Sequence, residues 1–167
     1  MKLSYLIKGL PGHPLHPPLT DITIGTYTFA TVAAFLNIVG LVGKSATSGW
    51  WLALLVGLCS TALTATTGFA DWLEIEWGSP LWKKATWHLS VMLVASGAFL
   101  AAALVGHACY RSGTVGAGAF VLTLIGYALL TLGGWLGGAL VFVHGMRVST
   151  DANGADNRHD TDEETQT

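Results

Sequence analysis

The sequence predicts an all-α integral membrane protein: an up-down-up-down four-helix bundle followed by a disordered acidic C-terminal tail. Hydrophobic residues make up 51% of the chain and charged residues only 11%. The mean hydropathy of +0.53 exceeds the range of ordinary soluble domains. Four apolar stretches are long enough to cross a hydrocarbon core of roughly 30 Å, which takes about 20 helical residues. None of the four contains Lys, Arg, Asp or Glu, so none offers the polar face that a soluble bundle needs.

The four spans are expected at residues 22–42, 50–70, 85–109 and 115–143, within a membrane domain covering residues 21–148. Residues 1–20 are expected to form a cytoplasmic N-terminal segment that carries the run His-Pro-Leu-His-Pro-Pro. The closely spaced prolines of this segment oppose regular helix before the first span. Residues 149–167 form the acidic tail, which has no large apolar side chain with which to order itself.

Basic residues predict the orientation in the membrane. Two of them, Lys44 and Arg111, flank the spans on one side, and five flank the other side: Lys2, Lys8, Lys83, Lys84 and Arg147. Cytoplasmic loops are enriched in Lys and Arg, so the side with five should be the cytoplasm. We therefore expect a multi-pass protein of the inner (plasma) membrane with both termini in the cytoplasm.

The fourth span carries two overlapping pairs of glycines, Gly133 with Gly137 and Gly134 with Gly138. Glycines four residues apart allow another helix to approach closely, because van der Waals packing drives helix association in lipid. The pairs predict tight packing on a neighbouring span of the same chain. A homodimer seam and space for a flat cofactor are the alternatives.

Hydroxyl-bearing residues recur at helical spacing along three of the spans. In the second span the series Ser60, Thr64 and Thr67 ends at Asp71. Such residues turn inward in membrane bundles and hydrogen-bond across helices. The alternative is that each hydroxyl bonds the carbonyl one turn earlier in its own helix.

Histidines and acids gather at the predicted cytoplasmic face. The up-down-up-down topology brings to that face six residues from four segments: His13, His16, Asp21, Asp71, His88 and His144. Ionisable groups at the membrane boundary are costly and usually mark function. Imidazole is the commonest protein ligand of haem iron, zinc and copper. We therefore expect His13, His16, His88 and His144 to bind a b-type haem or a divalent metal, with Asp21 and Asp71 supporting the ligands. The alternative is that these histidines bond only loops and carboxylates.

Motifs along most of the chain resemble one membrane family. The motifs are Gly-His-Pro-Leu-His-Pro-Pro-Leu-Thr-Asp from Gly12, Thr-Gly-Phe-Ala-Asp-Trp from Thr67, the segment around His88, and Gly-Gly-Trp-Leu-Gly-Gly from Gly133. In this order and spacing they are similar to the family called domain of unknown function 2231, over roughly residues 10–148. Some of its members are fused to Rieske-type iron–sulfur domains, which implies a redox setting for those members. The family often has Glu or His where this chain has Ala139.

Two functions from different classes remain open. One is a membrane redox or metal protein in which Asp71 orients a ligating imidazole. The other is a cofactor-free scaffold that binds a partner protein, its polar cluster fixing only the helix ends. No nucleophile–base pair points to an enzyme, and a transporter is a weaker third. The expected partners are the lipid bilayer and either a second copy of the chain or a redox protein, but no nucleic acid.

Overall fold

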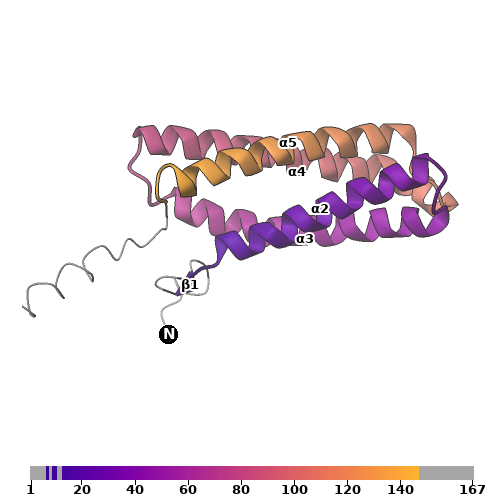
Figure 1. Cartoon of the computed structure of the whole chain (residues 1–167), viewed down its shortest axis with the longest axis horizontal. Coiled ribbons are helices and arrows are strands. Elements are labelled where there is room, and N and C mark those ends of the chain that lie inside the picture. The colour runs from indigo at the N-terminus through magenta and orange to yellow at the C-terminus, as the bar shows by residue number, and fades with distance from the viewer. Residues whose placement is uncertain (1–6, 8, 11–12, 147–167) are drawn as a thin grey trace, which may run out of the picture.

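The chain folds into four long helices, shown in Figure 1, which confirms the all-α four-helix bundle. The structure is a computed structural model and describes residue 7, residues 9–10 and residues 13–146. The helices are α2 (His16–Ile38), α3 (Lys44–Trp72), α4 (Pro80–Ser112) and α5 (Ala117–Phe142). All four are long and apolar enough to cross a membrane. The predicted acidic tail, residues 149–167, lies outside the described residues.

The first helix begins at His16, six residues before the expected start of the first span. The expectation that the prolines exclude helix up to that point was wrong. Pro17 and Pro18 occupy the first turn of α2, where the N–H groups have no partner within the helix. A proline there removes no hydrogen bond, and its fixed φ suits the helix. Ahead of α2, two short strands pair antiparallel, β1 (Gly9–Leu10) with β2 (His13–Pro14).

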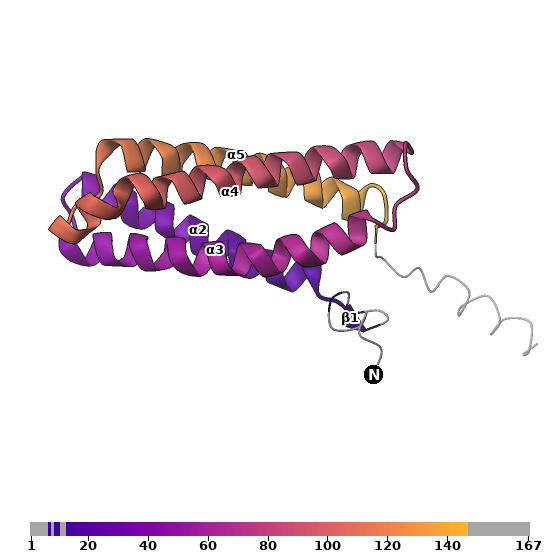
Figure 2. The same cartoon turned by 180° about the vertical axis from the view of Figure 1, so that it is seen from behind.

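The helices are arranged as two antiparallel hairpins, α2 with α3 and α4 with α5, as Figures 1 and 2 show. Helix α3 also contacts α4, and α2 contacts α5, which leaves α2 and α4 diagonally opposite each other. We call the end at which α2 and α4 begin the His16 end, and the opposite end the Lys44 end. The two hairpins separate toward the His16 end. At the Lys44 end they are joined by hydrogen bonds from Val115 to Asn37 and from Thr47 to Gly113.

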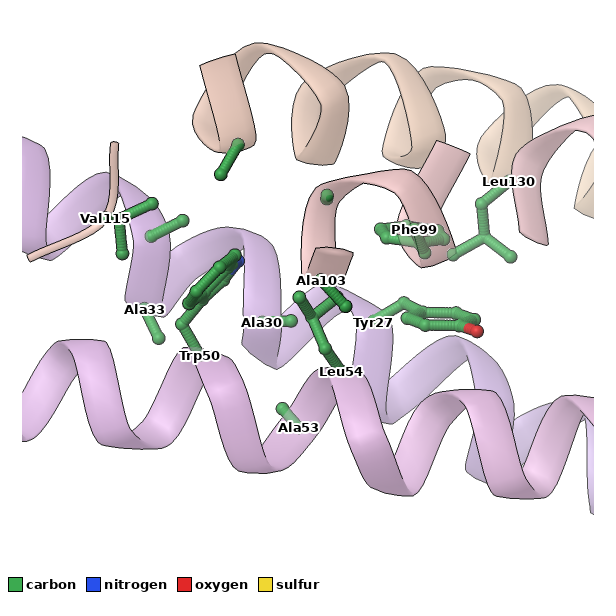
Figure 3. Packing of buried hydrophobic residues seen from close by; sticks show 13 residues of the cluster. Tyr27, Ala30, Ala33, Trp50, Ala53, Leu54, Phe99, Ala103, Val115 and Leu130 are labelled. Atoms are coloured by element: carbon green, nitrogen blue, oxygen red, sulfur yellow. The ribbon is translucent and has the colours of Figure 1, made fainter. Parts of the chain in front are cut away.

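The core lies in the middle of the bundle and is built around aromatic rings (Figure 3). Tyr27 of α2 and Phe99 of α4 stack across the bundle, with ring centroids 3.8 Å apart and an interplanar angle of 3°. Trp50 is fully buried, and its indole N–H donates to the Thr123 hydroxyl of α5 at 3.2 Å. These contacts tie α2 to α4 and α3 to α5, in each case without any charged group.

The distribution of side chains suits lipid rather than water. The buried polar groups of the described residues are almost all hydroxyls, with Asp71 as the exception. Large apolar side chains project outward from every helix, among them Phe29, Leu63, Leu104 and Trp135. Apolar surface on all sides is unusual for a soluble monomer and is expected of helices surrounded by acyl chains.

The hydroxyl series of the second span turns inward, as predicted. Thr23 of α2 donates to Ser60 at 3.1 Å and shares a hydrogen bond of 3.0 Å with Thr64. Tyr27 and Thr61 are linked in the same way at 3.0 Å. Several of these hydroxyls also donate to a carbonyl of their own helix, as Thr64 does to Ser60. The hydroxyl groups therefore form both kinds of hydrogen bond that were considered, within their own helix and between helices. The bonds between helices join α2 to α3.

The two glycine pairs of α5 have different surroundings. Gly133 faces Met92 of α4, and Gly137 faces the ring of His88 on the same helix. No described atom lies within 4 Å of a Cβ built on Gly134, and one built on Gly138 meets only Phe142 of its own helix. The first pair thus provides close packing inside the chain, whereas the second lies on the outside of the bundle.

Candidate functional site at the His16 end

A cavity of about 180 Å³ lies at the His16 end, between the two hairpins. All four helices contribute to its wall, which includes His16, Thr64, Asp71, His88 and Gly137. We call it the histidine cavity. Most of the rest of its lining is apolar, so the histidines and Asp71 are the ionisable groups that it holds.

His16 enters the histidine cavity from the first turn of α2. Its Nδ1 lies 3.0 Å from the carbonyl oxygen of Thr64 and 3.2 Å from the hydroxyl of Thr67, both on α3. A carbonyl oxygen can only accept, so the ring nitrogen donates and Nδ1 carries the proton. In the neutral ring, Nε2 then keeps its lone pair.

His88 is held in the same way by the other hairpin. Its Nδ1 lies 2.8 Å from the carbonyl oxygen of Gly133 on α5, so this nitrogen also donates. Among the described residues no hydrogen bond reaches Nε2 of His88 or of His16. Both imidazoles are therefore oriented by the backbone, with Nε2 left as an electron-pair donor.

Each ring also rests on a glycine one turn beyond its carbonyl partner. A Cβ built on Gly68, four residues after Thr64, would lie 2.6 Å from Cε1 of His16. A Cβ built on Gly137, four residues after Gly133, would lie 2.9 Å from Cε1 of His88. Any side chain at either position would push the ring away. The two hairpins thus present equivalent half-sites, each with a histidine, a carbonyl and a glycine.

The structure brings together only some of the residues selected from the sequence. Asp71 is 5% exposed and lines the histidine cavity together with His16 and His88. His13 is exposed in β2, and Asp21 is exposed on α2. His144 is also exposed, and its Nε2 accepts from the Lys84 ammonium at 2.8 Å. These last three residues do not line the cavity.

No three His, Cys, Asp or Glu side chains meet as a possible metal-ion site anywhere in the part of the chain that the structure describes. Zinc and similar ions usually take at least three protein ligands. The ligand-forming groups of the cavity are instead two imidazoles from diagonally opposite helices and the carboxyl group of Asp71.

Thr64, Thr67 and Gly68 were not selected as site residues from the sequence. The two hydroxyls were noted only as members of a polar stripe. A signal was available, because Thr64 with Gly68 has the same spacing as Gly133 with Gly137. Without the fold, nothing links that spacing to the histidines.

Comparison with known families gives one match. Residues 12–150 match the family described as predicted membrane protein (DUF2231). The chain belongs to this family. The match covers the four helices and both cavity histidines, so the resemblance noted from the motifs is confirmed. As a DUF2231 protein with four membrane-spanning helices, it resides in a lipid bilayer. No curated protein and no solved structure matches it.

Proposed function

We propose that this protein is a membrane redox protein that binds one b-type haem between His16 and His88. The observation that carries the proposal is the pair of equivalent half-sites. Each imidazole donates Nδ1–H to a backbone carbonyl, which fixes the ring and raises the basicity of Nε2. Haem supplies a one-electron iron couple when it is bound, and histidine is a common axial ligand of its iron.

Two histidines suit haem better than a bare metal ion. The tetrapyrrole would supply most of the iron's ligands itself, so His16 and His88 alone would be enough to hold it. Cofactor sites in helical bundles are built in the core from side chains on facing helices, and α2 and α4 face each other diagonally. Gly68 and Gly137 leave room for the rings of His16 and His88, because any side chain at these two positions would displace the rings. Asp71 is buried in the wall of the same cavity.

The histidine cavity has to widen when haem binds. Its volume of about 180 Å³ is below the ~300–1,000 Å³ typical of small-molecule sites. The hairpins already separate at this end, and residues 73–79 are the only covalent link between them there. A small further separation of α4–α5 from α2–α3 enlarges the cavity without breaking a helix.

An absorption spectrum tests the proposal. The protein is purified in detergent after expression with a haem precursor, and apoprotein is also titrated with haem. We expect a strong Soret band, the sharp visible bands of a six-coordinate low-spin iron after reduction, and saturation at one haem per chain. A protein that takes up no haem by either route would favour the cofactor-free scaffold instead.

The orientation in the membrane is part of the same proposal, because it decides which compartment the site serves. Lys83 and Lys84 lie at the His16 end and Lys44 and Arg111 at the other, so the histidine cavity should lie at the cytoplasmic face of the inner membrane. Alkaline phosphatase fused after Thr150 should be inactive, whereas a fusion after Gly43 should be active. Measured activities in the reverse order would place the cavity at the outer face.

A further inference from the structure

A second cavity, of about 400 Å³, lies at the Lys44 end, where α3 begins and α4 ends. We call it the basic cavity. Two of its lining residues are cations and three carry hydroxyls: Lys44, Ser48, Tyr110, Arg111, Ser112 and Gly113. It opens widely at the surface of the bundle, and both cations are exposed.

Among the residues that the structure describes, no acid lies at this end to compensate the two cations. Residues 22–70 and 85–150 contain no Asp or Glu, so the Lys44 end carries cations alone. Two like charges that share one cavity repel each other unless an anion lies between them. The ligand that the cavity favours is therefore negatively charged.

Hydrogen bonds fix the relative positions of the two sides of the basic cavity. Asn37 of α2 donates from its side-chain amide to the carbonyl of Gly43 at 2.9 Å, and its amide oxygen accepts from the N–H of Val115 at 2.8 Å. The buried Thr47 donates to the carbonyl of Gly113 at 3.0 Å. The start of α3 is thus fixed to the end of α4, so the cavity is formed before any ligand arrives.

The Lys44 side chain is itself positioned by packing. Gly113, which ends α4 with φ +85°, lies under its aliphatic stem, and a Cβ built there would be 2.8 Å from Cγ of Lys44. Arg111 lies two residues earlier on the last turn of α4. The ammonium and the guanidinium are consequently presented to the same space from two helices.

We propose that the basic cavity binds the phosphate group of an anionic phospholipid in the adjacent leaflet. The cavity lies at a helix end, where headgroup phosphates are found, and its two cations can pair with one such anion. Arginine matches the geometry of phosphate oxygens, and lysine adds a point charge. One and two turns deeper on the same helix faces, Leu52 and Leu104 are 62% and 71% exposed, which suits an acyl chain.

Lipid titration monitored by native mass spectrometry tests this site. Delipidated protein is titrated with phosphatidylglycerol and, separately, with phosphatidylcholine. We expect the chain to bind the first lipid more tightly. Replacing both cations, Lys44→Gln with Arg111→Gln, should weaken phosphatidylglycerol binding about 25-fold, since each basic residue contributes a factor of about five. Phosphatidylcholine binding should change little.

A charge-matched control separates the site from the overall charge. The pair Lys83→Gln with Lys84→Gln removes the same charge at the His16 end and should leave phosphatidylglycerol binding unchanged. Equal losses in the two double variants, or no loss in either, would overturn the proposal. A high concentration of inorganic phosphate should displace little lipid. Full displacement by inorganic phosphate would assign the cavity to a free anion and overturn the assignment to a lipid. Thermal unfolding of each variant verifies that it is folded.

Discussion

Replacing His88 by alanine should abolish stable haem binding. The substitution removes one of the two Nε2 donors and leaves the carbonyl of Gly133 without its partner. The expected result is a haem content near background after purification, with no low-spin spectrum on titration. His16→Ala should do the same, because the two half-sites are equivalent. Iron content by elemental analysis and the Soret absorbance per chain provide two independent measurements.

The control for this experiment comes from the histidines that the structure places elsewhere. His144→Ala and His13→Ala remove exposed side chains that do not line the histidine cavity, and both variants should keep their haem. If His144→Ala loses haem as completely as His88→Ala, the axial pair is not the one proposed. Undiminished haem in His88→Ala would contradict the site itself.

Replacing Gly133 by isoleucine should destabilise the bundle strongly. A Cβ at this position collides with Sδ of Met92, and α4 and α5 are in close contact along this face. Overpacking of a well-packed core typically costs about 1–3 kcal/mol, and we expect a loss within this range, since the flexible Met92 side chain can yield in part. Thermal unfolding in detergent, followed by circular dichroism, measures the change.

Gly134→Ile provides a matched control, because it adds the same side chain one residue away. No described atom lies within 4 Å of a Cβ at Gly134, so the unfolding temperature of the monomer should change little. The same variant also tests the homodimer alternative: a seam through Gly134 and Gly138 would dissociate on size-exclusion chromatography. Equal destabilisation by the two substitutions would remove the special packing role of Gly133.

The four helices could be predicted from the sequence because the signal is simple. Long stretches without charge have no stable place in water, and each of the expected spans lies almost entirely within an observed helix. The positions of the helix ends were harder to predict from the sequence. Prolines read as helix breakers in a linear pattern, yet Pro17 and Pro18 fall in the one turn that tolerates them. A proline stops a helix when it lies in the helix interior and is tolerated when it lies in the first turn, so its effect depends on where the helix begins.

The site could be predicted in part. His16, His88 and Asp71 were placed at one membrane face by counting spans, and they do line one cavity. The direction of a side chain beyond a helix end is set by the local turn. Counting membrane spans along the sequence does not reveal that turn. Helix α5 ends at Phe142, and the turn that follows directs His144 toward Lys84. The carbonyls that fix the rings left no trace in the sequence, since every residue has one.

The equivalence of the two half-sites has an architectural consequence. Each hairpin carries a complete unit, with His16, Thr64 and Gly68 in one and His88, Gly133 and Gly137 in the other. Pairing two copies of one such hairpin about a twofold axis would generate the same arrangement. A single loop joining the end of the first copy to the start of the second then yields this chain. The molecule therefore has the arrangement of two repeated hairpins, with His16 and His88 on opposite sides of the pseudo-twofold axis.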